Sequence, residues 1–413
     1  MTATVTPHPA GSRRLFGELD YDDARRGHLA AAHETMPSAA GENRLSALPE
    51  EGPRRRAGLR QLGPNWFAAV MGTGIVGNAA ATLPLQFPGL RGTAIVTWGL
   101  AALLLVVLSS AWAVQWMRFP DSARGQWNHP VMSQFFGAPP MALLTVGAGT
   151  LLLGRDVIGL SAAVAVDWVL WSAGTALGLL TAIAIPYRMF THHHFEPNAA
   201  FGGWLMPVVP PMVSAALGAL LLPYAPAGQI RLTMIVLCVA MFGMSLIAAL
   251  VTITMIWSRL AHYGIPEAGM VPTLWLVLGP LGQSFTAAGL LANAAPTALP
   301  DLYAKGLTVF SVIFGVATWG FAMLWLALAI TVTAKTARAG TLKFNLTWWG
   351  FTFPLGTCVT GSTVLYSHTG ANLFAAAAVA LYIVLVSAWA VVGVRTARGL
   401  LDGTLLRPAP ATA

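Results

Sequence analysis

Ten long apolar runs are the feature that most constrains how this chain folds. A helix needs about 20 apolar residues to cross the hydrocarbon core of a membrane. The composition agrees, because 56% of the residues are hydrophobic, only 9% are charged and the mean hydropathy is +0.66. These values exclude an ordinary soluble domain. We therefore predict an all-α polytopic membrane protein in a lipid bilayer, with ten transmembrane helices at 64–82, 92–117, 132–153, 161–186, 203–222, 229–257, 271–291, 302–333, 346–366 and 371–394.

The segments that flank the apolar runs are different. Residues 1–63 mix both charges with Ala, Gly, Ser and Pro, and we predict a flexible cytoplasmic tail there. This segment also lacks the apolar stretch of a cleavable signal peptide. Residues 64–396 then form the ten-helix transmembrane domain, and residues 397–413 form a short cytoplasmic C-terminal tail. Cys238 and Cys358 lie inside apolar runs, which favours packing roles over a disulfide.

The basic residues predict the orientation of the chain. If the N-terminal tail is cytoplasmic, 19 of the 23 Lys and Arg residues lie on that side, which leaves Arg91, Arg155, Arg231 and Lys305 outside. Cytoplasmic loops carry an excess of Lys and Arg, so both termini are expected in the cytoplasm, with the protein in the cytoplasmic membrane. The net charge of +8 therefore reports orientation, and we expect no nucleic-acid partner.

Prolines inside the odd-numbered spans reveal an internal repeat. Val70, Pro140, Pro211, Pro280 and Pro354 share one register at intervals of about 70 residues. This predicts five repeated helical hairpins in the same orientation. Carbonyls freed by proline must be buried in protein or line a wet path, so we predict kinked odd helices around a central pore, with the even helices as an outer ring. The alternative is that these prolines and nearby glycines only serve helix packing.

The same register predicts which residues line the pore. The position three residues after each proline position is polar in four of the five repeats, and it lies on the same helix face as the position before the proline. Small residues nearby leave space or let backbones approach. The predicted pore-lining set is Gly72, Thr73, Gly74, Pro140, Pro211, Ser214, Gly279, Pro280, Gln283, Pro354, Gly356 and Thr357.

Phe353 breaks the pattern of small residues before the proline. The other four repeats have Ala69, Pro139, Pro210 and Gly279 at this position. A single aromatic ring in a narrow pore forms an apolar plug that excludes water. We therefore predict Phe353 as the gate, and the alternative is ordinary packing of the ring between helices.

Charged residues within the spans predict the sign of the transported ion. Asp167, near the start of an even span, is the only carboxylate inside a span, and no Lys or Arg lies in the core of an odd span. Hydroxyls, an amide and broken backbone stabilise an anion through weak dipoles and let it leave again. The path is therefore expected to carry a small inorganic or dicarboxylate anion. Asp167 is either interfacial, paired between helices, or part of a proton relay.

A run of three histidines raises a metal-binding alternative. His192, His193 and His194 stand in "THHHFEP", and imidazole binds zinc and similar ions. Three consecutive side chains of a regular helix do not converge, however, and the sequence has no second Cys/His cluster. We predict no metal, no cofactor and no enzymatic activity. A membrane-embedded metal-dependent enzyme or sensor that uses these histidines is the alternative from another class.

Three stretches carry a family resemblance: "PNWFAAVMGTGIV", "LGPLGQSF" and "WWGFTFPLGT". They resemble the tellurite-resistance/dicarboxylate transporter family, which includes plant slow anion channels, fungal malate permeases and fungal sulfite efflux pumps. The likeness covers about residues 64 to 396, and "GPLGQ" followed by "FPLGT" is most similar to the sulfite branch. The resemblance implies ten helices in five hairpins, a homotrimer with one pore per protomer, and a gating phenylalanine at Phe353.

The resemblance also implies efflux of a sulfite-like oxyanion, with C4-dicarboxylate (malate) transport or tellurite resistance as alternatives. Neither the residues nor the resemblance decides between a channel and a proton-coupled carrier.

Overall fold

The computed structural model describes residues 58–406, and within this range the chain is helical and contains no strand. Seven helices of the described part are long and apolar enough to cross a membrane. The chain is therefore a polytopic membrane protein. Two short helices, α4 (Pro120–Asn128) and α6 (Arg155–Ile158), lie in or next to connections between the longer ones.

Five long helices present most of their apolar surface to the outside. In four of them only 22% of the most apolar stretch is buried, and in the fifth 39%. An apolar and exposed face suits a lipid environment, where apolar side chains need no protein partner. These outer helices are α3 (Leu90–Arg118), α7 (Leu160–Thr191), α9 (Gln229–Tyr263), α11 (Asp301–Arg338) and α13 (Asn372–Leu401).

Five shorter helices are buried among the long ones. The stretches that contain α5 and α10 are 89% and 94% buried. Each short helix follows a 3₁₀ segment, at 64–66, 132–137, 202–205, 268–277 and 346–351. These inner helices are α2 (Phe67–Thr82), α5 (Ala138–Gly149), α8 (Pro210–Leu221), α10 (Leu278–Ala294) and α12 (Phe353–Thr369).

The register prolines lie at the start of the inner helices. Pro140, Pro211, Pro280 and Pro354 all fall in the first turn of an α-helix, directly after a 3₁₀ or turn segment. Proline suits the first turn because its missing N–H would have no partner there and its φ is already helical. The expected kink is therefore a change from 3₁₀ to α at one end of the helix, and the α-helical part is not broken at the proline.

The 3₁₀ segments also explain why some inner helices are short. α2 and α12 have 16 and 17 residues, and α8 has 12. A 3₁₀ helix rises about 2.0 Å per residue and an α-helix about 1.5 Å, so the run Pro64–Thr82 extends over about 30 Å. This is about the thickness of the hydrocarbon core.

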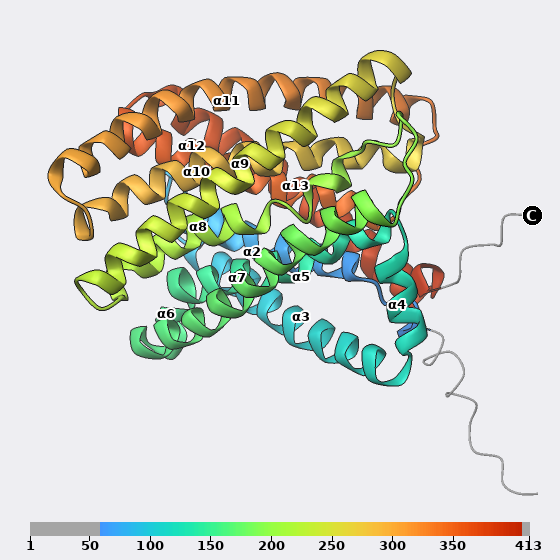
Figure 1. Cartoon of the computed structure of the whole chain (residues 1–413), viewed down its shortest axis with the longest axis horizontal. Coiled ribbons are helices and arrows are strands. Elements are labelled where there is room, and N and C mark those ends of the chain that lie inside the picture. Colours follow the sequence, from blue (N-terminus) through green and yellow to red (C-terminus); the bar gives the residue numbers. More distant parts are fainter. Residues whose placement is uncertain (1–57, 407–413) are drawn as a thin grey trace, which may run out of the picture. The chain divides into compact units, whose positions relative to one another are not determined.

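The inner helices form a closed ring. α2 packs against α5, α5 against α8, α8 against α10, α10 against α12, and α12 returns to α2. Each outer helix contacts the inner helix that precedes it in sequence and the next one around the ring; α13, the last, contacts α12 and α2. Figure 1 shows α3 and α11 at opposite edges of this arrangement, with α2, α5, α8 and α10 between them.

Tryptophans fasten outer helices to the ring. A buried indole N–H usually finds an acceptor, and at least one tryptophan on each of four outer helices donates to an oxygen of an inner span; on α11 Trp325 also donates to the Leu274 carbonyl. On α9, the Ser245 hydroxyl donates to the Val208 carbonyl over 2.6 Å instead. The other four of these indole bonds run from Trp98 to Thr150 Oγ1 (3.2 Å), Trp171 to the Ser214 carbonyl (2.9 Å), Trp319 to Ser362 Oγ (3.0 Å) and Trp389 to Thr73 Oγ1 (3.1 Å).

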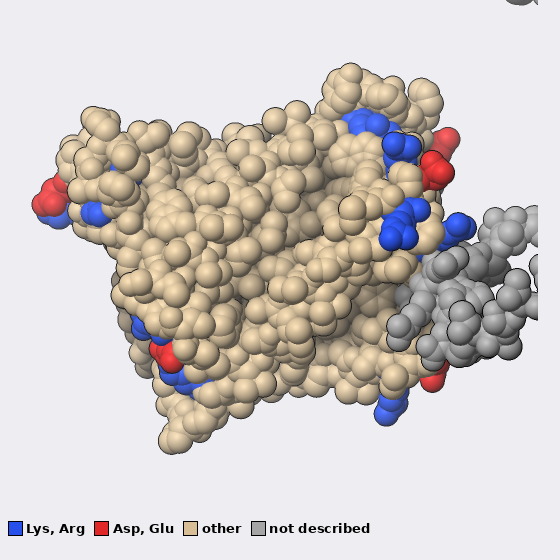
Figure 2. Space-filling model, turned by 90° about the horizontal axis from the view of Figure 1, so that it is seen from below, with Lys and Arg blue, Asp and Glu red and all other residues tan. Residues whose placement is uncertain are grey.

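On one face of the described part (Figure 2), charged side chains are absent from the middle. On the face in Figure 2, Lys, Arg, Asp and Glu gather at the two ends of the view, with a broad uncharged band between them. For example, Arg91 in the first turn of α3 pairs with Asp156 of α6 over 2.6 Å. An uncharged band between two charged ends is typical of a protein that spans a bilayer.

Candidate functional site

A cavity of about 70 Å³ lies inside the ring of inner helices. All five inner spans contribute to its wall, and none of the lining residues is ionisable. The cavity therefore has the composition of a neutral path through the centre of the ring. Its lining residues are Ile75, Asn78, Thr82, Thr145, Ala148, Leu152, Val213, Leu217, Leu220, Gln283, Thr286, Leu290, Phe353, Thr360 and Val364.

Gln283 is a polar side chain of the cavity wall whose whole amide group is without a partner among the described residues. It is 4% exposed, and no described residue forms a hydrogen bond with its amide. The hydroxyls nearby are already engaged: Thr286 donates to the Gly282 carbonyl over 2.8 Å, and Thr360 donates to the Thr357 carbonyl over 3.1 Å. Both N–H groups of Gln283 are thus free to donate to an occupant of the cavity.

Asn78 connects two helices at the cavity wall. Its Nδ2 donates to the Thr145 carbonyl over 3.0 Å, which ties α2 to α5 and fixes the direction of the amide. Its Oδ1 is buried and has no partner among the described residues. The Thr145 hydroxyl donates to the Met141 carbonyl over 2.7 Å. This side of the cavity therefore offers acceptor oxygens, whereas Gln283 offers donors.

Phe353 lies between this cavity and a second, smaller one. The second cavity, of about 20 Å³, is on the side of the 3₁₀ segments, and its lining residues include Met71, Met206, Trp349 and Pro354. Among the described residues, Phe353 alone lines both cavities. Its side chain is 4% exposed. Phe353 therefore borders both spaces.

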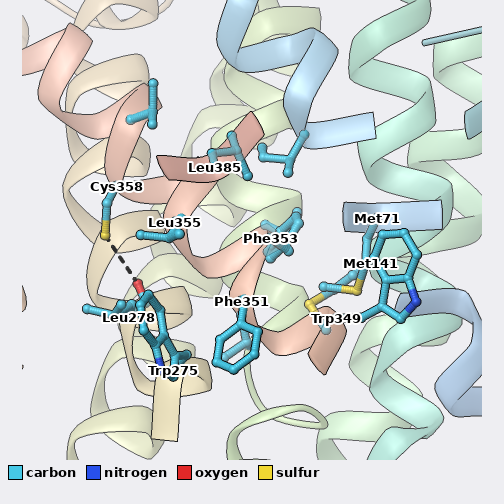
Figure 3. Close-up of a cluster of buried hydrophobic side chains, with 14 of the residues drawn as sticks. Met71, Met141, Trp275, Leu278, Trp349, Phe351, Phe353, Leu355, Cys358 and Leu385 are labelled. Atoms are coloured by element: carbon cyan, nitrogen blue, oxygen red, sulfur yellow. Dashed lines mark hydrogen bonds between the residues drawn. The ribbon is translucent and has the colours of Figure 1, made fainter. Parts of the chain in front are cut away.

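Figure 3 shows how α12 directs this ring. Phe353 points to the side of α12 where Met71 of α2 and Met141 of α5 lie, whereas Leu355 and Cys358 point to the opposite side, toward Leu278. The Cys358 thiol lies 3.8 Å from the Leu278 carbonyl, and both cysteines of the chain are buried and free. α12 thus directs Phe353 toward α2 and α5 and packs its other side on α10.

The predicted hydroxyl residues of the pore do not line the cavity in this structure. Thr73 Oγ1 accepts the indole N–H of Trp389, and Thr357 donates to the Pro354 carbonyl over 2.7 Å. Ser214 is fully buried, and its backbone carbonyl accepts the indole N–H of Trp171. These side chains lie between helices, so of the four polar register positions only Gln283 reaches the cavity wall.

The predicted glycines lie in close helix contacts. A methyl group at Gly72 would overlap Thr352, one at Gly74 would lie 2.8 Å from Thr145, and one at Gly356 would overlap Ile75. Gly279 has more room, since a methyl there would meet only Pro354, at 3.9 Å. Gly72, Gly74 and Gly356 therefore let the inner helices approach one another, as in the alternative that the small residues serve helix packing.

The four register prolines, which we predicted to line the pore, do not line the central cavity. Pro140, Pro211 and Pro280 start their helices and do not line the cavity, whereas Pro354 lines the smaller second cavity. Their contribution is to set where each inner α-helix begins.

Several cavity residues were missed by the sequence analysis, among them Asn78, Thr145, Thr286 and Thr360. A signal for two of them was present. Thr286 follows Gln283 by three residues, and Thr360 follows Thr357 by three, so each shares a helix face with a register position. Continuing the polar register by one turn would have found them.

Asp167 lies outside the ring. It is 1% exposed on α7, and its Oδ1 is close to Gly147 of α5. Its Oδ2 has no hydrogen-bond partner, and no ion pair of the described residues includes it. The carboxyl is therefore buried between an inner and an outer helix and does not line the cavity.

The three histidines do not form a common site. His192 Nδ1 lies 2.6 Å from Thr191 Oγ1, whereas the His193 ring packs beside Phe195. Burial and the nearby Arg188 guanidinium hold the pKa of His193 below its usual value. In residues 58–406 no group of three or more His, Cys, Asp or Glu side chains is placed to hold a metal ion.

Comparison with known proteins gives the family. The sequence profile of the voltage-dependent anion channel family matches residues 61–397, which is most of the chain. The chain belongs to this family. Membership in an anion channel family agrees with a ring of buried helices around a neutral cavity, and the activity of this protein is anion transport.

Three relatives of this protein are 22–28% identical to it over the aligned residues. An uncharacterized transporter of Methanocaldococcus jannaschii is 28% identical over 84% of this chain and 96% of its own length. A sulfite efflux pump of Trichophyton rubrum is 28% identical over 86% of this chain and 96% of its own length. A malic acid transport protein of Schizosaccharomyces pombe is 22% identical over 70% of this chain and 67% of its own length. These relatives are transporters by name, not enzymes.

Proposed function

We propose that this channel protein moves a small oxyanion of the sulfite type through the centre of the five-helix ring, across the cytoplasmic membrane. The observation that carries the proposal is the cavity, which all five inner spans line without any ionisable residue and in which the Gln283 amide keeps two free donors. A buried carboxylate in the path would favour a cation, whereas neutral donors stabilise an anion without trapping it.

Two observations favour sulfite over malate as the proposed substrate. The sulfite efflux pump of Trichophyton rubrum matches over nearly its whole length, whereas the malic acid transport protein matches over two thirds of its own. A cavity of about 70 Å³ also fits a small oxyanion more readily than a C4 chain with two carboxylates. Transport of C4-dicarboxylates is the second candidate, because the cavity enlarges if Phe353 moves.

The membrane arrangement proposed here has ten spans in five hairpins, with both termini in the cytoplasm. Support comes from the pairing of each inner helix with the outer helix that follows it, and from the Lys and Arg bias of the loops. The 3₁₀ segments then lie on the cytoplasmic side. A homotrimer with one path per protomer is proposed on the family resemblance.

In the proposed mechanism Phe353 is the gate. An apolar ring between two small cavities excludes water, and an ion that cannot keep its hydration shell does not pass. When the ring turns aside the cavities join, and the anion exchanges part of its water for the N–H groups of Gln283. The remaining wall is proposed to consist of Asn78, Thr82, Thr145, Thr286 and Thr360 and the apolar residues beside them.

The deciding experiment is a reversal potential in a planar bilayer that contains the purified full-length protein. Gradients of sulfite, malate, chloride and protons are imposed one at a time. We expect the reversal potential to follow each permeant anion, with sulfite the most permeant, and to ignore the proton gradient. A cation-selective current would refute the proposal, and a reversal potential that follows protons would make the protein a coupled carrier.

A further inference from the structure

His368 lies just beyond the cavity, at the end of the ring opposite Phe353. On α12 it follows the cavity residue Val364 by four positions, and on α10 Asn293 follows the cavity residue Leu290 by three. Positions three and four apart share a helix face. Both side chains therefore continue the two cavity-lining faces outward by one turn, and they meet there: His368 Nε2 lies 2.7 Å from Asn293 Oδ1.

The other ring nitrogen of His368 faces Ser311 on α11. His368 Nδ1 lies 3.0 Å from Ser311 Oγ, and the Ser311 hydroxyl donates its proton to the Thr308 carbonyl over 2.8 Å. Ser311 Oγ is thus available as an acceptor, as is Asn293 Oδ1. In the neutral ring both bonds form when Nε2–H donates to Asn293 and Nδ1 accepts from Ser311; in the cation both form when the Ser311 hydroxyl donates to Thr308 instead, so these partners also accommodate the charged ring.

No charged group of the described residues pairs with this ring. Its partners on α10 and α11, Asn293 and Ser311, are neutral, and Tyr366 lies two positions earlier on another face of α12. At the start of α11, Asp301 and Lys305 lie 3.5 Å from each other. Arg231 at the start of α9 donates to the carbonyls of Pro223, Ala225 and Thr297.

We infer that His368, held by Ser311 and Asn293, is an anion-binding group at the outer mouth of the pathway and takes a small oxyanion that enters or leaves the cavity. The inference rests on the proposed function. A cation at the mouth of a neutral path raises the local concentration of anions and speeds their entry. Histidine becomes a cation only when it is protonated, so acid on that side of the membrane strengthens the effect.

The test measures chloride current through the purified full-length protein in a planar bilayer, with the pH changed on one side only. Chloride is the probe because its charge does not change with pH, unlike that of sulfite. For the wild type we expect the current to rise on the order of threefold when the pH on the His368 side falls from about 7.5 to 5.5, and no rise for the same change on the other side.

Three variants separate the possible causes. His368→Gln keeps a polar side chain without the titration, so its current stays low at both pH values while its selectivity for anions is retained. Asn293→Asp places a carboxylate beside the ring, and the neutral pair that results also loses the acid response. His262→Gln is the matched control, since His262 bonds only to Ser258 of its own helix. It keeps the wild-type response.

The outcomes distinguish this inference from the proposed function. An undiminished acid response in both His368→Gln and Asn293→Asp overturns the binding role of His368 and leaves anion transport standing. A cation-selective wild-type current refutes the proposed function itself. Size-exclusion profiles in detergent check folding, and Asn293→Asp decides the question if His368→Gln does not fold.

Discussion

The inner ring and the outer helices use the same residue types under different constraints. Gly282 of α10 and Gly320 of α11 are both glycines in the middle of a helix. A Cβ at Gly282 would lie 2.6 Å from the backbone nitrogen of Cys358, whereas a Cβ at Gly320 would meet nothing within 4 Å. In the ring, glycine lets two backbones touch. On the outer helix nothing in the structure requires it.

Side-chain exposure follows the same division. Val96 of α3 and Ile183 of α7 are 71% and 68% exposed, whereas Leu355 and Phe285 in the ring are fully buried. Lipid solvates the outer side chains, so their shapes are free to vary. The ring has to pack against itself and still leave space in its centre, and for this reason the residues that shape that space are expected to dominate transport.

The strongest test of this difference is Phe353→Ala, which removes the ring between the two inner cavities. Because the apolar barrier is lost and the cavities join, we expect anion current to rise on the order of tenfold. The measurement is chloride and sulfite flux into proteoliposomes at matched protein density. Phe310→Ala on α11, where the ring is 41% exposed, is the control and leaves the flux unchanged. Equal fluxes in wild type and Phe353→Ala would exclude the gate.

The next largest effect is expected on stability, from alanine substitutions at Gly282 and Gly320. Gly282→Ala forces a methyl group against the backbone of Thr357 and Cys358, which cannot move without opening the contact between α10 and α12. We expect a loss of about 1–3 kcal/mol in stability from overpacking. Gly320→Ala has open space and gains helix propensity of up to about 1 kcal/mol. Thermal unfolding in detergent compares them, and equal midpoints would contradict the division.

The smallest effect is expected at Asp167, the buried carboxyl of an outer helix. Its Oδ2 has no partner and the side chain does not line the cavity, so Asp167→Asn removes no bond to that oxygen and no pathway group. We expect stability to stay within about 1 kcal/mol of wild type and anion flux to be unchanged with and without a proton gradient. Loss of a flux driven by protons in this variant would assign a relay role to Asp167.

Much of the architecture could be predicted from the residues. Pro140, Pro211, Pro280 and Pro354 predicted an interruption in four inner spans, and each of them lies in the first turn of an α-helix after a 3₁₀ or turn segment, where proline fits best. The lack of charge in the odd spans predicted a neutral cavity. The residues of the cavity wall were harder to predict from the sequence. Thr73, Ser214 and Thr357 share their register with Gln283, and yet they face other helices.

The reason for this difference is geometric. A sequence repeat sets the depth of a residue in the membrane, but the face it presents depends on how each helix is rotated, and one residue turns a helix by about 100°. Rotation is decided by contacts between distant segments, such as Asn78 with Thr145, or Trp389 with Thr73. These contacts leave no local mark in the sequence.

The sequence by itself therefore determined that the chain is a helical membrane protein, that four of its inner spans carry a proline in one shared register, and that no Lys, Arg, Asp or Glu lies in these spans. Only the tertiary structure decided that Gln283 faces the cavity, that Phe353 stands between two cavities, and that His368 meets Asn293 and Ser311 at the far end. Hydrophobicity and proline geometry act locally along the chain. The direction of a side chain depends on packing between helices that are far apart in sequence.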